Sequence, residues 1–198
     1  MTVQHNIGGV WKAMDTCKVN IGGVWKEVAK SWVNINGVWK VEIEAFTPAI
    51  GMSYGGGIIF YIDGTGQHGL IAATSDQSAD IQWYNGSYIV TGATATAIGT
   101  GNANTNTIVA VQGAGSYAAS LCANLVLDGY ADWYLPSKDE LNELYLNKTA
   151  VGGFASAYYW SSSEYDTTYA WIQTFANGSQ NNYYAKANPN YVRAVRAF

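Results

Sequence analysis

The amino-acid sequence predicts an α+β domain that follows three short β-hairpins. Three observations support this prediction. A short unit recurs near the N-terminus, the amino-acid composition changes near residue 47, and the later pattern indicates two strands, two helices and three more strands. Helices that are grouped together, instead of alternating with parallel strands, are typical of α+β domains. The 198 residues suffice for one globular domain of about 150 residues and a short appendage.

The repeated unit occupies residues 6–12, 20–26 and 34–40, so successive copies begin 14 residues apart. Each copy places Gly-Gly or Asn-Gly between β-forming residues, and these dipeptides supply the positive φ angles of a two-residue hairpin turn. A single hairpin is only marginally stable and cannot bury its own tryptophan, so the units are expected to stack on one another or on another chain. We therefore predict an assembly or attachment module over residues 1–46.

The second domain, residues 47–198, begins after the repeat ends and Thr47-Pro48 interrupts the pattern. Residues 57–62 and 69–73 are apolar runs that predict two buried strands, and the Gly-rich residues 63–68 predict the turn that joins them. Residues 91–115 are almost uncharged and rich in Gly, Thr and Asn, which predicts a long loop or irregular layer.

Two helices and three strands are predicted in the rest of the chain. Residues 116–127 carry an apolar stripe that includes Leu125 and Val126, with Gly129 as a stop signal. Within residues 135–146, Ser137 and Glu140 have the spacing of a capping box at a helix N-terminus. Strands are predicted over residues 158–163, 170–175 and 191–198, with turn-rich spans at 164–169 and 177–190.

Composition excludes several classes of partner. Only 12% of residues are charged, about half the usual ~25%, and a net charge of −4 with 10 Lys and Arg residues predicts no nucleic-acid binding. No apolar run approaches the ~20 residues that span a bilayer, and residues 1–10 lack the features of a signal peptide, so we expect no membrane insertion. Cys17 and Cys122 lack metal-ligand spacing, and we expect two reduced, buried thiols and no cofactor or metal.

An enzymatic function is not expected, because none of the common catalytic motifs is present. His68 lies in a Gly-rich turn, and the carboxylates of Asp132, Asp139, Glu140 and Glu143 are explained by the preference for acidic residues near a helix N-terminus. Residues 55–57 form a Gly-Gly-Gly run, which we interpret as relief of crowding between neighbouring chains.

Arg193 and Arg196 are the only arginines, and on a strand their spacing sends them to opposite faces. A guanidinium that lies against the domain needs a partner, so we expect structural ion pairs, with the carboxylates near the second helix as candidates.

The last 41 residues favour a binding surface. Residues 158–198 hold seven of the 15 tyrosines and five asparagines, but only five charged residues. Tyrosine supplies rigid contact area, while Ser, Asn and Gly supply adaptable hydrogen bonds, as in antibody combining sites. Ordinary polar loops between strands are the alternative explanation.

Five segments together resemble a bacterial and phage domain family with a C-type-lectin-like fold. They are GGIIFYIDGTGQHGLIAA at residues 56–73, QWY at 82–84, DWYLPSKDEL at 132–141, YWSSSE at 159–164 and YVRAVRAF at 191–198. The family includes variable target proteins of diversity-generating retroelements and the glycan-binding tip of a collagen-like bacterial adhesin. The resemblance covers about residues 50–198 and implies a receptor-binding protein with two helices packed on antiparallel sheets and a ligand surface built from C-terminal strands and loops.

In retroelement targets, mutagenesis of adenines in Asn-type codons excludes Lys, Gln, Glu, Met and Trp at the varied positions. The resemblance therefore implies a variable ligand-binding surface at positions that obey this restriction: Tyr165, Asp166, Thr167, Thr168, Tyr169, Ile172, Thr174, Ala176, Ser179, Asn181, Asn182, Tyr183, Tyr184, Ala187, Asn188, Pro189 and Asn190. The interleaved Trp171, Gln173, Gln180 and Lys186 are then fixed scaffold positions.

The hairpin units resemble short Gly-Val-Trp-Lys units of phage tail proteins, which implies a homo-oligomer, with a trimer favoured, on a phage tail tip or a bacterial cell surface. The expected partner is a host-cell surface receptor, either protein or glycan. Two alternatives stay open: a structural tail or surface component without its own ligand, and a glycan-specific lectin with a fixed site. The Glu-Pro-Asn and Trp-Asn-Asp calcium signatures of animal lectins are absent, as are the paired cysteines of formylglycine-generating enzymes.

Overall fold

The computed structural model describes residues 46–198 in full and, within residues 1–45, the backbone of six strands. The chain divides into two compact units, Met1–Thr47 and Pro48–Phe198. In the first unit the strands pair antiparallel as three hairpins, as the repeat predicts. They are β1 (Gln4–Ile7) with β2 (Val10–Ala13), β3 (Lys18–Ile21) with β4 (Val24–Glu27), and β5 (Lys30–Ile35) with β6 (Val38–Ile43). Cys17 and the three tryptophan side chains of the repeats lie outside the described residues.

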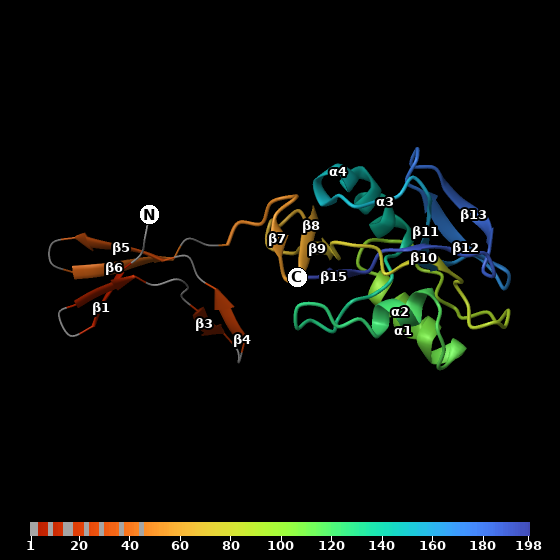
Figure 1. Cartoon of the computed structure of the whole chain (residues 1–198), viewed down its shortest axis with the longest axis horizontal. Helices are drawn as coiled ribbons and strands as arrows, with labels where there is room; N and C mark the ends of the chain where they lie inside the picture. The colour runs from red at the N-terminus through yellow and green to blue at the C-terminus, as the bar shows by residue number, and fades with distance from the viewer. Residues whose placement is uncertain are drawn as a thin grey trace. The chain divides into compact units, whose positions relative to one another are not determined.

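The second unit has a mixed α+β architecture with two sheets, as predicted. The larger sheet has the order β10 (Ser78–Ile81), β14 (Asn190–Val192), β11 (Tyr158–Glu164), β12 (Tyr169–Thr174) and β13 (Gln180–Ala185). The smaller sheet has the order β15 (Val195–Ala197), β9 (Gly69–Ala72), β8 (Gly57–Ile62) and β7 (Ser53–Tyr54). All pairs are antiparallel except β11 with β14, and β13 forms an edge of the larger sheet (Figure 1).

This unit has four helices where two were expected: α1 (Gly101–Gln112), α2 (Ala118–Ala123), α3 (Lys138–Leu146) and α4 (Lys148–Val151). Figure 1 shows α1 and α2 on one side of the strands and α3 and α4 on the other. Trp83, Trp160 and Phe60 are among the largest side chains without solvent exposure, and they lie in the two apolar clusters that fill the unit.

The predicted capping box of α3 is confirmed. The backbone N–H of Glu140 donates to the Ser137 hydroxyl at 3.3 Å, and the backbone N–H of Ser137 donates to the Glu140 carboxylate at 2.7 Å. The strands predicted over residues 57–62, 69–73, 158–163 and 170–175 are also present, with ends that differ by one residue at most.

Three predictions of secondary structure within residues 91–190 are wrong. Residues 91–115 are not a continuous irregular layer, because α1 forms where Ile108 is buried and the Thr105 hydroxyl accepts from the Leu135 backbone. The helix predicted over residues 116–127 ends at Ala123, which leaves Val126 68% exposed and off the apolar stripe. The span 177–190 contains the strand β13, whose ladder to β12 outweighs its turn-like composition.

The predicted C-terminal strand, residues 191–198, is divided between the two sheets. Arg193 and Ala194 separate β14 in the larger sheet from β15 in the smaller one. Both arginines are consequently buried, and the alternation expected for one continuous strand does not apply. At Gly57 the chain approaches a neighbouring segment closely, as predicted for the Gly-Gly-Gly run. A side chain there would collide with the Ala72 carbonyl and the Ile71 side chain.

Candidate ligand-binding surface

A buried ion pair lies under the C-terminal strands. The Lys186 ammonium contacts the Glu164 carboxylate at 2.6 Å, and neither side chain has solvent exposure. The ammonium also donates to the Thr167 carbonyl at 3.0 Å and the Ile89 carbonyl at 3.4 Å, and it lies 4.7 Å from the centre of the Trp83 ring. A buried charge is tolerated when it is paired and hydrogen-bonded in this way.

The Glu164 carboxylate receives further donors from a second loop. The backbone N–H groups of Thr91 and Gly92 donate to it at 2.9 Å and 2.8 Å. Glu164 and Lys186 thus hold three segments together: the loop before α1, the turn between β11 and β12, and the chain after β13. The Lys186 side chain therefore lies in the interior of the unit.

A partly exposed aromatic cluster lies on strands β12 and β13 and in the turn before β12; it consists of Tyr165, Tyr169, Trp171 and Tyr183. The ring centres of Tyr165 and Tyr183 are 5.3 Å apart. The Tyr169 ring lies 6.0 Å from Tyr183, and the Trp171 ring lies 6.2 Å from Tyr165. All three pairs are edge-to-face. Such pairs contribute about 0.5–1.5 kcal/mol beyond area burial. The cluster is therefore an ordered surface, although Tyr183 is 65% exposed and Tyr165 is 42% exposed.

The hydroxyls of Tyr165 and Tyr183 are 3.5 Å apart. This hydrogen bond raises the pKa of the Tyr165 phenol above its ordinary value. The Tyr165 hydroxyl therefore stays neutral at physiological pH and can donate to and accept from a ligand.

Tyr184 faces the other side of β13. Its ring lies 5.1 Å from Tyr158 and 5.8 Å from Trp160, so it is half-buried against the apolar core. The four tyrosines among the predicted variable positions are thus placed as two exposed rings, Tyr165 and Tyr183, and two half-buried ones, Tyr169 and Tyr184.

Gln173 and Gln180 connect the strands to α3. The Gln173 amide donates to the Asn142 side chain at 2.9 Å, and the Gln180 amide donates to the Lys138 carbonyl at 2.8 Å. These bonds point inward, as expected of scaffold positions. At the same edge, the Lys138 ammonium lies 5.1 Å from the Trp171 ring and is paired with Asp139 at 3.0 Å.

The structure places 15 of the 17 predicted surface positions at exposed or half-buried sites. Ile172 and Asn190 are the corrections, because they are only 2% and 4% exposed. Ile172 belongs to the apolar core beneath β12, and Asn190 pairs with Ile81 inside the larger sheet. Neither side chain can reach a ligand on this surface.

The two arginines form structural ion pairs elsewhere in the unit. Arg196 donates to both carboxylate oxygens of Asp132 at 2.7 Å and 2.8 Å, and its hydrogen bonds lower the pKa of Asp132. Arg193 is paired with Asp76 at 2.8 Å, a partner that the sequence did not indicate because Asp76 is 117 residues away. The expectation of partners near the second helix is therefore right for Arg196 and wrong for Arg193.

Glu140, one of the carboxylates near the second predicted helix, has structural contacts. Glu140 is buried and accepts from the backbone N–H groups of Gly99 at 2.8 Å and Ser137 at 2.7 Å, which ties the start of α1 to α3. Burial raises the pKa of Glu140. Cys122 is a buried free thiol, as expected, and burial raises its pKa too.

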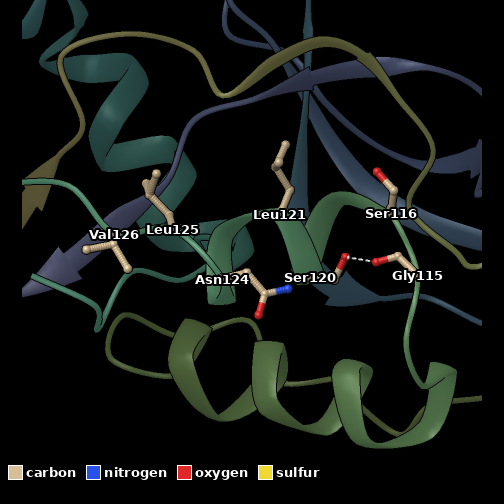
Figure 2. Close-up of a pocket in the computed structure, with 7 residues that line it drawn as sticks. All are labelled: Gly115, Ser116, Ser120, Leu121, Asn124, Leu125 and Val126. Carbon is tan, nitrogen blue, oxygen red and sulfur yellow. Dashed lines mark hydrogen bonds between the residues drawn. The ribbon is translucent and has the colours of Figure 1, made fainter.

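One cavity of about 290 Å³ lies beside α2, lined by Gly115, Ser116, Ser120, Leu121, Asn124, Leu125 and Val126. Figure 2 shows the Ser120 hydroxyl donating to the Gly115 carbonyl, at 2.7 Å, so this polar group is already used inside the protein. The cavity shares no lining residue with the aromatic cluster. Within residues 46–198, no group of three or more His, Cys, Asp or Glu side chains gathers as a metal site would, and none of the described helices is long and apolar enough to cross a membrane.

Comparison with known proteins identifies the family to which this chain belongs. The sequence model of the Lcl C-terminal domain matches residues 72–196, more than half of the chain. Among solved structures, a fimbrial protein from Bacteroides ovatus ATCC 8483 is similar, with 17% identity and a TM-score of 0.47 over 65% of this chain. The match spans 35% of the length of that fimbrial protein, and a comparison with curated proteins finds no match. The Lcl match includes most of the motifs from which the family resemblance was stated, and the chain belongs to the Lcl C-terminal domain family.

Proposed function

We propose that this chain is a receptor-binding protein of the adhesin type, which holds another molecule at a surface without transforming it. The observation that carries the proposal is the aromatic cluster, in which Tyr165 and Tyr183 are exposed while the Glu164–Lys186 ion pair, which includes the residue next to Tyr165, is completely buried. Exposed tyrosines that are held rigidly offer large contact area at a low entropic cost, and tyrosine is enriched among residues that dominate binding energy. Membership of the Lcl C-terminal domain family supports the same role.

The scaffold of this surface is proposed to be C-type-lectin-like, and its exposed positions are proposed to be varied by a diversity-generating retroelement. The inward bonds of Gln173, Gln180 and Lys186 support this division into fixed and varied positions. The genetic test is the DNA next to the gene. A reverse transcriptase and a near-copy of the 3′ coding end, with differences restricted to adenines, are expected there; a locus without that copy would leave adhesion intact and remove the diversification.

The three hairpins are proposed to assemble the chain into a homo-oligomer, with a trimer favoured, on a phage tail tip or a bacterial cell surface. Short strand pairs gain stability by stacking on further strands, which supports assembly as their role. Light scattering of the full chain gives the number of copies. A monomer at micromolar concentration contradicts this part of the proposal.

Receptor binding is tested by titrating the fluorescently labelled full chain against a panel of intact bacterial cells. The double substitution Tyr165→Ala/Tyr183→Ala is expected to weaken binding at least about tenfold, as for residues that dominate an interface. Tyr130→Ala is the matched control, because Tyr130 is 39% exposed but lies in the segment after α2. Unfolding temperatures of all variants establish that each is folded.

Two results contradict the receptor-binding proposal. If the folded wild-type chain binds no cell in the panel but assembles normally, the chain is a structural component without its own ligand. If it binds and the double variant binds equally well, the aromatic cluster is not the contact surface.

A further inference from the structure

Residues 88–90 form a short apolar segment at the protein surface, in the loop before α1. Tyr88, Ile89 and Val90 are 46%, 42% and 58% exposed. Three consecutive exposed apolar residues are unfavourable in a soluble protein unless they serve a contact.

The segment lies beside the turn that carries Tyr165. The carbonyl oxygens of Ile89 and Thr167 are both within 3.4 Å of the same Lys186 nitrogen atom. Because Thr167 is two residues from Tyr165, the backbone of the apolar segment is a neighbour of the aromatic cluster.

The segment is also held in place on both sides. The next two backbone N–H groups, of Thr91 and Gly92, donate to the buried Glu164 carboxylate, and the Tyr88 ring packs on Tyr84 with 4.8 Å between ring centres. A loop fixed in this way loses little conformational entropy when it binds a partner. The ion pair that supports the aromatic cluster therefore fixes the apolar segment too.

The charges around this surface indicate the class of partner. Lys186 is buried and paired with Glu164, and Lys138 is paired with Asp139. The Asp166 carboxylate accepts from the backbone of Thr168 and Tyr169. A polyanionic partner is recognised by several accessible Lys or Arg side chains, and these contacts supply no such set.

The side chains of Ile89 and Val90 further restrict the chemical class of the partner. Ile89 and Val90 have no hydrogen-bonding groups for sugar hydroxyls and no aromatic face for a sugar ring, so their contribution to binding comes from burial of apolar area. Apolar side chains of a protein surface provide that area. The core of a protein interface is depleted of charge and enriched in aromatic residues, as this surface is.

We infer that Tyr88, Ile89 and Val90 extend the ligand-binding surface beyond the C-terminal strands, and that the partner is a protein with an apolar, weakly charged contact patch. This inference rests on the proposed receptor-binding function. The segment lies outside the predicted variable positions, so it supplies a constant part of the contact beside a part that varies.

The test uses the full chain and the cell type that the wild-type protein binds in the titration described above. The double substitution Ile89→Ser/Val90→Ser is expected to weaken binding about tenfold, with no change in oligomeric mass. Leu146→Ser/Val126→Ser is the matched control, because Leu146 and Val126 are 63% and 68% exposed at the end of α3 and in the segment after α2. Protease treatment of the cells is expected to abolish binding, and periodate oxidation of their glycans is expected to leave it unchanged.

The opposite results separate the two proposals. If Ile89→Ser/Val90→Ser binds like the wild type while Tyr165→Ala/Tyr183→Ala does not, the segment lies outside the contact surface and the receptor-binding function stands. Binding that survives protease and disappears after periodate identifies a glycan partner and overturns the inferred class. A change in oligomeric mass on substitution assigns the segment to contacts between copies of this chain. A wild-type chain that binds no cell overturns both proposals.

Discussion

Replacement of Lys186 by methionine is the most direct test of how the candidate surface is supported. Methionine keeps an unbranched side chain but removes the ammonium, which contacts Glu164 at 2.6 Å and the Thr167 carbonyl at 3.0 Å with no solvent exposure. Glu164 keeps its bonds from Thr91 and Gly92, yet its charge stays buried without a counter-ion. Removing one member of a buried pair costs about 3–5 kcal/mol, so Lys186→Met is expected to lower the free energy of unfolding by about that amount.

The measurement is thermal and urea unfolding of the full chain, followed by near-ultraviolet circular dichroism. A loss of about 3–5 kcal/mol corresponds to a fall in unfolding temperature of about 6–20 °C, since 1 kcal/mol shifts it by about 2–4 °C in a chain of this size. Lys138→Met is the control, because the Lys138–Asp139 pair is solvent-exposed at 24% and 42% and such pairs contribute about 0–1 kcal/mol.

A second variant separates the loss of the pair from the exposure of a lone charge. Glu164→Gln/Lys186→Met removes both charges, and replacing a buried pair as a whole is often close to neutral. The double variant is therefore expected to be more stable than Lys186→Met alone. If Lys186→Met unfolds within about 1 kcal/mol of the wild type, the Glu164–Lys186 pair does not stabilise this surface.

Three further predictions concern individual groups. Arg196 lowers the pKa of Asp132, so the pair stabilises the fold above the unfolded pKa of about 3.9, and this stabilisation is lost as the pH falls through the folded pKa. Asp132→Asn is therefore expected to lower the free energy of unfolding by about 1 kcal/mol at pH 7, measured by urea unfolding. A stability difference between wild type and variant that stayed constant below pH 4 would contradict the assignment. Tyr183→Phe is expected to return the raised pKa of Tyr165 towards its ordinary value in an NMR titration of labelled tyrosines, whereas an unchanged pKa would show that the two hydroxyls do not interact. In a Cys17→Ser background, buried Cys122 is expected to react with a thiol reagent only at the rate of unfolding, and rapid labelling of the native protein is the contrary result.

Elements whose signals are local could be predicted from the sequence. The capping box of Ser137 and Glu140 lies within four residues, and it correctly predicts the start of α3. The apolar runs of β8 and β9 with a Gly-rich turn between them are equally local. The family motifs also allowed the overall fold class of the second unit to be predicted, because they are distributed over that whole unit.

Elements that depend on distant partners could not be predicted in the same way. The sequence of α1 has no charges and many Asn and Thr residues, and its stability comes from contacts such as Asn104 to the Ala95 carbonyl at 2.7 Å. The polar strand β13 forms because β12 supplies a ladder. No spacing rule relates Lys186 to the loop at residues 89–92, so the support of the aromatic cluster, and the apolar segment beside it, required the structure.

The division of β13 and its neighbours into inward and outward side chains has a consequence for tolerance to mutation. Gln180 and Lys186 bond into the body of the unit, whereas Asn181 and Tyr183 between them face solvent. Exchanges at exposed positions usually change folding stability by less than about 0.5 kcal/mol. Substitutions at the exposed positions of β13 are therefore expected to change the chemistry of this surface while the chain still folds.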